Sequence, residues 1–159
     1  FEQITIERFQ ILRQLAKKYE FRVGFEPLGF PNCSVRKVNK SLDIIKESEK
    51  DGLPPSGLII DTFHFFLAEH TSKDLLNIPE DRLWLVHVND SVEKPLNVLQ
   101  DSDRVWLGEG FFQLDDFFKN LKSTGYDDYI SIELFNEDYW KLSPQEVAET
   151  ALNSIKKYF

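Results

Sequence analysis

Sulfur-containing side chains are scarce in this 159-residue sequence, which has one cysteine, Cys33, and no methionine. A single cysteine forms no internal disulfide and has no second thiolate nearby, so a disulfide-stapled fold and a cysteine-rich zinc site are both excluded. A lone thiol suits a reducing compartment. The sequence begins at Phe1, and we therefore expect a fragment of a longer chain.

Long apolar runs and a surplus of basic residues are also missing. No run approaches the roughly 20 apolar residues that cross a bilayer, and the first residues show no signal-peptide pattern. These features predict a cytoplasmic protein with no membrane partner. The sequence has 19 Lys and Arg and 27 Asp and Glu, which gives a formal net charge of -8. This balance disfavours nucleic acid as a partner, because that affinity depends on clustered basic side chains.

The apolar residues, 42% of the sequence, follow strand and helix spacings in turn. Short apolar runs predict strands at 21–26, 57–61, 83–88 and 129–134. Three- and four-residue spacings predict helices at 4–19, 35–51 and 114–124, and a Ser-Pro-Gln-Glu capping box at 143–146 opens another. A short helix is also expected at 72–77, closed by Pro79. The polar stretch 89–110 has no clear period, and a connection of that length is usually functional.

Strands that alternate with helices predict an α/β fold with a parallel sheet and right-handed crossovers. A closed eight-stranded (β/α)8 TIM barrel takes about 250 residues. Four units match half of such a barrel, so we predict that residues 1–159 form one domain of parallel (β/α) units.

Each predicted strand ends near an ionisable side chain: Glu26, Asp61, His87 and Glu133. In parallel α/β folds these ends meet at one edge of the sheet. Three carboxylates and one imidazole suit Zn²⁺, Mn²⁺, Co²⁺ or Mg²⁺, and a cation relieves their mutual repulsion. A strand-end carboxylate is commonly only a helix N-cap or a solvated charge. Four together favour a site, because burying them without a function is costly.

Several motifs carry a resemblance that covers nearly the whole chain. They are Phe-Glu-Pro-Leu-Gly at 25–29, Asp-Thr-Phe-His-Phe at 61–65, Val-His-Val-Asn-Asp at 86–90, Asp-Arg-Val-Trp-Leu-Gly-Glu-Gly at 103–110, Ser-Ile-Glu-Leu-Phe at 131–135 and Tyr-Trp-Lys-Leu at 139–142. The sequence resembles the xylose isomerase-like sugar isomerases and epimerases, most closely their inosose isomerase branch. The resemblance places the chain in the C-terminal half of the family's TIM barrel.

The resemblance implies that Glu26, Asp61, His87 and Glu133 bind one divalent metal. It also implies that Glu26 and Glu133 act as general acid and base on a cis-enediolate. The implied activity is a metal-dependent ketol isomerase that interconverts 2-keto-myo-inositol and 1-keto-D-chiro-inositol. The metal polarises the carbonyl and stabilises the enediolate charge.

The resemblance further implies that His64 hydrogen-bonds a substrate oxygen, although a histidine packed at a strand end is the simpler alternative. Arg104 either clamps substrate hydroxyls or pairs with Asp103 at the surface. Trp106 is a candidate for substrate binding, because it could form an apolar wall together with Phe65 and Trp140. The alternative for each of these three residues is packing in the core. Asp90 and Glu109 are weaker candidates for supporting the ligands. His70 is interpreted as a solvated residue at a helix start.

Two alternatives remain open. A ketose epimerase of the same family is disfavoured by Asn32, which stands where those enzymes have a second glutamate. A non-catalytic polyol-binding protein that retains the metal site is the other. A phosphodiesterase on the same barrel needs more histidines than the 3 present. The expected partners are a polyol ketone or ketose, and either the missing N-terminal half-barrel or a second copy of the chain.

Overall fold

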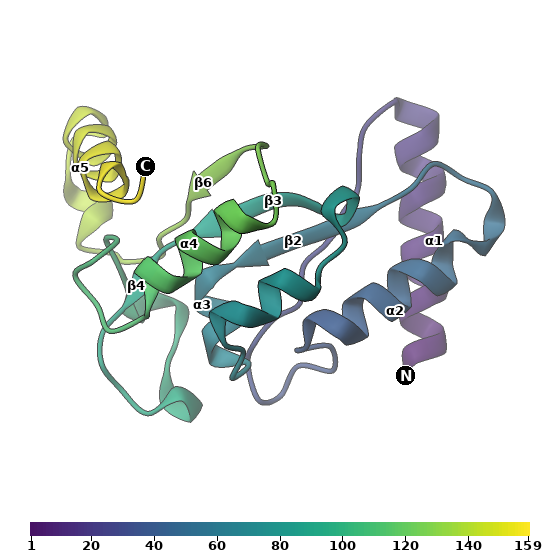
Figure 1. Ribbon diagram of the computed structural model, residues 1–159, viewed down its shortest axis with the longest axis horizontal. Coiled ribbons are helices and arrows are strands. Elements are labelled where there is room, and N and C mark those ends of the chain that lie inside the picture. The colour runs from purple at the N-terminus through teal and green to yellow at the C-terminus, as the bar shows by residue number, and fades with distance from the viewer.

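A parallel four-stranded sheet organises the chain (Figure 1). The computed structural model describes residues 1–159, except for the side chain of residue 51. The strand order is β1-β2-β3-β6, and every neighbouring pair is parallel. The predicted parallel α/β fold is therefore confirmed. The strands are β1 Gly24–Phe25, β2 Gly57–Asp61, β3 Leu83–Val88 and β6 Ile130–Ile132.

The crossovers between parallel strands place helices against the sheet. In Figure 1, α2, α3 and α4 lie on the viewer's side of the sheet, and α5 stands apart near the C-terminus. Because the strands follow one another in one direction across the sheet, crossovers of one hand place their helices on one face. The helices are α1 Glu2–Tyr19, α2 Val38–Ser48, α3 Thr62–Leu67, α4 Leu114–Ser123 and α5 Pro144–Lys156.

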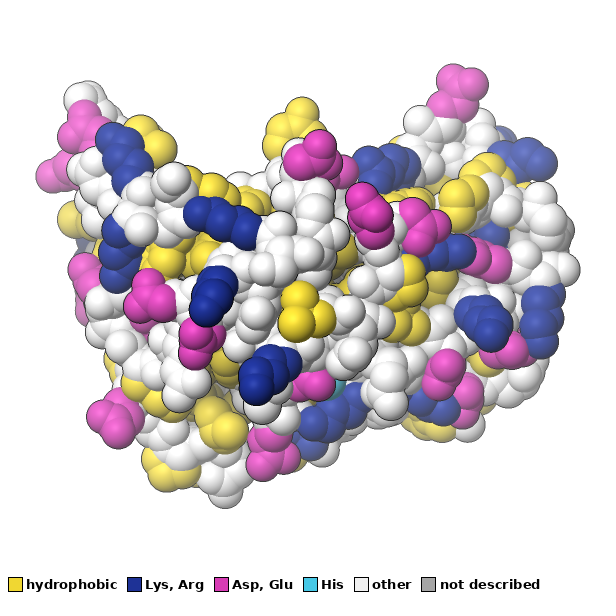
Figure 2. Space-filling view, in the orientation of Figure 1, with side chains coloured by type: hydrophobic (Ala, Val, Ile, Leu, Met, Phe, Trp, Pro, Cys, Tyr) yellow, Lys and Arg dark blue, Asp and Glu magenta, His cyan; other side chains and the backbone are white. Residues whose placement is uncertain are grey.

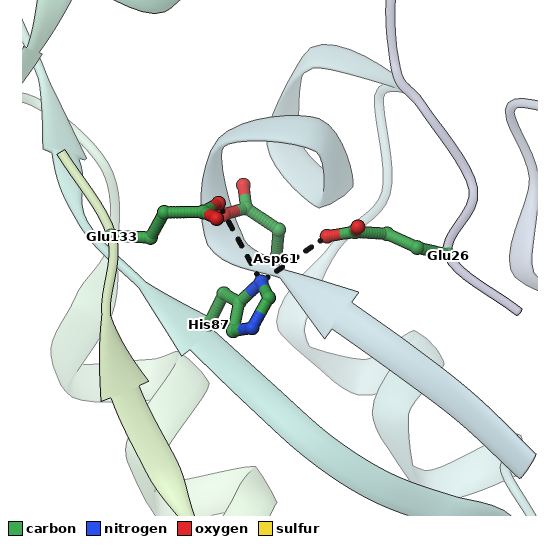
Figure 3. A group of neighbouring side chains, drawn as sticks. All are labelled: Glu26, Asp61, His87 and Glu133. Carbon is green, nitrogen blue, oxygen red and sulfur yellow. Dashed lines mark ion pairs between the residues drawn. The ribbon is translucent and has the colours of Figure 1, made fainter. Parts of the chain in front are cut away.

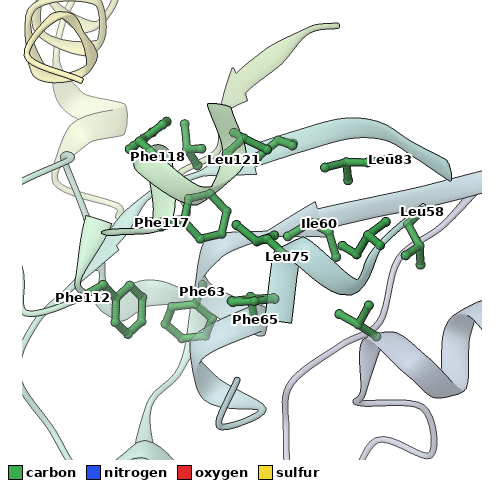
Figure 4. Packing of buried hydrophobic residues seen from close by; sticks show 14 of the residues in the cluster. Leu58, Ile60, Phe63, Phe65, Leu75, Leu83, Phe112, Phe117, Phe118 and Leu121 are labelled. Atoms are coloured by element: carbon green, nitrogen blue, oxygen red, sulfur yellow. The ribbon is translucent and has the colours of Figure 1, made fainter. Parts of the chain in front are cut away.

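The core lies between the sheet and these helices (Figure 4). Leu58 and Ile60 of β2 and Phe117 of α4 are all buried in this one cluster. Because side chains alternate across a strand, Ile59 and its register partner Leu85 point to the opposite face, where both are only half-buried. The fold thus leaves one face of the sheet without a helical layer.

The predicted strand at 83–88 has the bounds observed for β3, whereas the outer strands are shorter than predicted. Of residues 21–26 only Gly24–Phe25 pair, and of residues 129–134 only Ile130–Ile132 pair. Each outer strand has a single neighbour, β2 for β1 and β3 for β6. With one ladder instead of two, fewer residues are held in strand geometry.

Three local features differ from what the sequence predicted. Helix α3 was not predicted and begins directly after Asp61, whose carboxylate accepts the backbone N–H of His64 at 3.0 Å and caps it. Residues Ser72–Asn77 form a 3-10 helix rather than an α-helix. The polar stretch contains two short antiparallel strands, β4 Asp90–Ser91 and β5 Arg104–Val105.

His70 is not the solvated residue that we expected. Its side chain is only 10% exposed, and its ring stacks on Phe65 with the centroids 4.8 Å apart. Its Nε2 accepts the backbone N–H of Val38, at the start of α2, at 3.2 Å. Phe65 itself is buried in the core cluster. Of the two alternatives for Phe65, an apolar wall at the substrate or packing in the core, the structure shows core packing. At α5, the Ser143–Glu146 capping box is confirmed.

The described surface is mixed in charge. On the face shown in Figure 2, basic and acidic side chains are interspersed over the helices, and neither sign forms a continuous patch among the side chains visible there. Among the helices of the described residues, none is both long and apolar enough to cross a bilayer.

Candidate metal centre

The C-terminal ends of all four sheet strands deliver one ionisable side chain each (Figure 3). Asp61 is the last residue of β2, and it is the register partner of His87 on β3. Glu26 directly follows β1, and Glu133 directly follows β6. The outer strands therefore carry the two glutamates, and the inner strands carry the aspartate and the histidine.

The four side chains converge on one point. One donor atom from each lies within 4.8 Å of the others. His87 Nδ1 lies 3.4 Å from Glu26 Oε1 and 3.5 Å from Glu133 Oε2. Figure 3 shows the two glutamates approaching the imidazole from opposite sides.

Two buried atoms of this cluster lack ordinary partners. Among the described residues, Glu26 Oε1 and His87 Nδ1 have no hydrogen-bond partner. Buried polar atoms are nearly always satisfied, and a cation between these atoms would satisfy both. Three carboxylates with one imidazole form a donor set that fits Zn²⁺ or Mn²⁺. The residues present therefore fit a single divalent metal.

The electrostatics of the cluster depend on burial and on opposed charges. Burial raises the pKa of Asp61 to about 6, although Arg104 opposes the rise. The carboxylates of Glu133 and Glu26 raise the pKa of His87 to about 10. His87 in turn lowers the pKa of Glu133 to about 2. Without a metal, the imidazole thus carries a proton at neutral pH and supplies a positive charge in the cluster.

Arg104 adds a second positive charge beside the four converging side chains. Its guanidinium is almost fully buried, with Nη1 2.7 Å from Asp61 Oδ2 and 3.1 Å from Glu133 Oε2. Nη2 lies 2.8 Å from Asp101 Oδ1. The alternative of a surface pair with Asp103 is wrong, because Asp103 pairs with Lys94 instead.

His64 lies beside Arg104 rather than among the four converging donors. Its Nε2 is 3.4 Å from Arg104 Nη2, and within the described part of the chain its buried Nδ1 has no hydrogen-bond partner. Burial lowers the pKa of His64, so this imidazole is neutral at neutral pH. The Arg104 guanidinium also lies over the Phe63 and Phe135 rings, at 4.8 and 4.9 Å from their centroids.

Trp106 is buried two residues beyond Arg104. Its ring stacks on Tyr139 with the centroids 4.6 Å apart. Trp140, by contrast, is 64% exposed. Among the described residues, no ring contact joins either tryptophan to the four converging side chains, so the part of both tryptophans in an apolar wall stays a prediction.

Asp90 organises the loop that carries Arg104 and Trp106. Its buried carboxylate accepts the backbone N–H groups of Gly108, Gly110 and Phe112 at 3.0 to 3.1 Å, and that of Ser91 at 2.8 Å. A side chain at Gly110 would collide with this carboxylate and with the backbone of Ser91. Asp90 thus holds the loop backbone, and its support of the converging side chains stays a prediction.

Sequence reasoning missed Asn89, Thr62 and Asp101 as parts of the centre. Asn89 Nδ2 donates to Asp61 Oδ2 at 2.9 Å, and Thr62 hydrogen-bonds Asn89. The sequence positions of two of them could have indicated this: Thr62 directly follows Asp61, and Asn89 lies two residues after His87.

Comparison with known proteins agrees with this arrangement. The model of the xylose isomerase-like TIM barrel family matches residues 2–158. The chain is 32% identical over 159 residues to the inosose isomerase of Bacillus licheniformis, a match that covers 98% of this chain and 56% of the relative. It is 24% identical over 156 residues to the 3-dehydroshikimate dehydratase of Pseudomonas putida, covering 97% of this chain and 24% of that protein.

Solved structures show the same fold. The crystal structure of the IOLI protein with a binding zinc atom matches with a TM-score of 0.87 at 29% identity, covering 99% of this chain and 57% of that one. The chain spans a little over half the length of the inosose isomerase that it matches. Since the family model matches nearly every residue and the whole chain superposes on an IOLI structure, the chain belongs to the xylose isomerase-like TIM barrel family.

Proposed function

We propose that the protein is a divalent-metal-dependent ketol isomerase that interconverts 2-keto-myo-inositol and 1-keto-D-chiro-inositol. The similarity to inosose isomerases supports the substrate. The observation that carries the proposal is the position of Glu26 and Glu133, which approach the centre from opposite sides of His87. A ketol isomerase needs one group to remove a proton from carbon and another to return a proton to the neighbouring carbon.

In this proposal Glu26, Asp61, His87 and Glu133 hold the metal. A bound divalent cation supplies Lewis acidity, which polarises the substrate carbonyl and acidifies the adjacent C–H bond. Each glutamate has two carboxylate oxygens, so one can bind the metal while the other exchanges a proton.

The proton balance follows from the ketol rearrangement. One glutamate takes the proton from the hydroxyl-bearing carbon, which gives a cis-enediolate. The other glutamate gives a proton to the former carbonyl carbon, and the hydroxyl proton passes to the former carbonyl oxygen. The carbonyl therefore moves to the adjacent ring carbon with no net oxidation. The first glutamate then releases its proton to solvent and the second takes one up, which restores both groups for the next turnover.

We assign substrate contacts to His64, Arg104 and Trp106. The neutral His64 has a free Nδ1 among the described residues and can bond a substrate oxygen. Arg104 lies beside the ligands Asp61 and Glu133 and can orient a hydroxyl. Trp106 extends the same loop and contributes apolar surface for C–H groups.

Charge favours a neutral substrate over a carboxylic acid such as 3-dehydroshikimate. The guanidinium of Arg104 already contacts the carboxylates of Asp61, Glu133 and Asp101. A substrate carboxylate would compete with these carboxylates for the same cation and would meet Glu26 nearby. A polyol ketone adds no charge to this centre.

We also propose that residues 1–159 are one half-barrel domain, the second half of the barrel. The relatives are longer, since the match covers 56% of the Bacillus licheniformis inosose isomerase. The half-buried Ile59 and Leu85 on the face without helices suit contact with further barrel strands. A preceding half-barrel, or a second copy of the chain, would complete the substrate pocket.

The test is hydrogen exchange with solvent. The full-length protein that contains these residues is incubated with Mn²⁺ and 2-keto-myo-inositol in D₂O, and the ring protons are followed by NMR. We expect deuterium beside the carbonyl and formation of the isomer. Glu133→Gln should abolish both, whereas Glu137→Gln, which removes an exposed carboxylate four residues away, should leave them unchanged.

The same experiment separates the alternatives. Exchange with a free ketohexose but not with 2-keto-myo-inositol would identify a ketose epimerase. Metal binding without exchange on either compound would favour the non-catalytic polyol-binding protein. Full activity of Glu133→Gln would remove this residue from the acid–base pair.

A further inference from the structure

Asn89 is a fully buried polar residue at the centre of the converging strand ends. It follows β3 directly, and none of its surface is exposed. Its Nδ2 donates to Asp61 Oδ2 at 2.9 Å and to the backbone oxygen of Glu133 at 3.2 Å. One side chain therefore contacts residues at the ends of β2 and β6 while its own backbone continues β3.

Thr62 fixes the direction in which the Asn89 amide points. The Thr62 hydroxyl lies 2.9 Å from Asn89 Oδ1 and 2.8 Å from the Asn89 backbone oxygen, and it accepts the backbone N–H of Asn89 at 2.9 Å. Because Asp61 Oδ2 and the Glu133 backbone oxygen are acceptors, the NH₂ group of the amide faces them and Oδ1 faces the Thr62 hydroxyl. The orientation is set by a residue that is itself fully buried.

The two carboxylate oxygens of Asp61 have different hydrogen-bond partners. Oδ2 accepts from Asn89 Nδ2 at 2.9 Å and from Arg104 Nη1 at 2.7 Å. A carboxylate oxygen has two lone-pair directions, so Oδ2 is filled. Oδ1 accepts only the backbone N–H of His64, at 3.0 Å, among the described contacts, and so keeps one direction free.

The neutrality of the Asn89 amide matters here. Arg104 also binds Oδ2, but its positive charge opposes the approach of a metal cation, whereas an amide fixes the carboxylate without adding charge. A neutral donor can therefore hold Asp61 in place and leave the negative charge of the cluster available to the cation.

We propose that Asn89 is a positioning residue of the metal centre. It fills Oδ2 of Asp61, so that Oδ1 is presented as the single ligand oxygen, and it holds the ends of three strands at the spacing that the metal requires. The inference rests on the proposed metal-binding role of the cluster. Thr62 acts through Asn89 by fixing the amide.

The test measures metal affinity rather than turnover. Full-length parent protein and variants are stripped with a chelator and titrated with Zn²⁺ and Mn²⁺ by calorimetry and chelator competition. Asn89→Ala should weaken binding by about 10- to 100-fold, the usual effect of losing a residue that orients a metal ligand. Thr62→Val keeps the side-chain shape and should weaken binding in the same direction. The control Asn97→Ala, an exposed asparagine, should bind like the parent.

Two further measurements separate positioning from general destabilisation. Circular dichroism and melting in EDTA report whether each metal-free variant is folded, and the Mn²⁺ EPR spectrum of the loaded protein reports ligand symmetry. We expect a changed spectrum in a folded variant. If Asn89→Ala does not fold, Thr62→Val decides the question.

The outcomes distinguish this inference from the proposed function. If the parent binds metal and both folded variants bind it within twofold of the parent, the positioning role of Asn89 is refuted and the metal site stands. If the parent protein binds neither metal, the proposed function is refuted together with this inference.

Discussion

Metal binding to this protein should release a proton from His87. Without metal, the carboxylates of Glu133 and Glu26 raise the pKa of His87 to about 10. A metal ligand must be the neutral imidazole. The proton and the metal therefore compete for the same nitrogen, and the apparent metal affinity must rise with pH below about 10.

The size of the effect follows from the pKa values. At pH 7 only about one His87 side chain in 1000 is deprotonated, and the apparent affinity rises about tenfold per pH unit. Burial raises the pKa of Asp61 to about 6. Below that pH a second proton must leave, so the slope steepens toward about 100-fold per unit.

Calorimetry measures this proton release directly. Zn²⁺ is titrated at pH 7.5 in buffers that differ in ionisation enthalpy, and the dependence of the observed heat on the buffer gives the protons released per metal. We expect about one at pH 7.5 and a number approaching two below pH 6. Glu133→Gln removes the largest cause of the raised His87 pKa and should lower the count, whereas the exposed Glu137→Gln should not.

The result that would refute this reasoning is metal binding with no proton released at pH 7.5. In that case His87 is either already neutral in the metal-free protein or not a ligand. A normal count in Glu133→Gln would contradict the assigned cause of the raised His87 pKa.

Three stability predictions follow from buried contacts, each read from urea unfolding in EDTA. Arg104→Met leaves Asp61 buried without its 2.7 Å partner and should cost about 3 kcal/mol; an unchanged midpoint would contradict this. Asp90→Asn cannot accept all four backbone N–H groups and should cost about 2 kcal/mol more than Glu93→Gln, an exposed change in the same loop. Phe117→Ala empties a fully buried core position and should cost about 3 to 5 kcal/mol.

Local patterns in the sequence predicted the frame of the molecule. The apolar run 83–88 matched β3, and the capping box at Ser143 matched the start of α5. These signals work because hydrophobic spacing and caps act over a few neighbouring residues. The position of each converging side chain at a strand end was also predictable, since parallel strands end at one edge.

Contacts between distant segments had no such signal. Arg104 lies 43 residues from Asp61, and only packing of the loop onto the sheet decides that it pairs there rather than with its neighbour Asp103. The sequence also suggested a solvated His70, but the start of α2 and the Phe65 ring cover it.

The sequence by itself determined the alternation of strands and helices and the four strand ends that carry Glu26, Asp61, His87 and Glu133. Tertiary structure alone decided which neutral and charged donors surround them, including Asn89 and Arg104. The physical reason is range: side-chain spacing along the chain fixes which face is buried, whereas hydrogen-bond partners at the centre depend on how the buried faces pack.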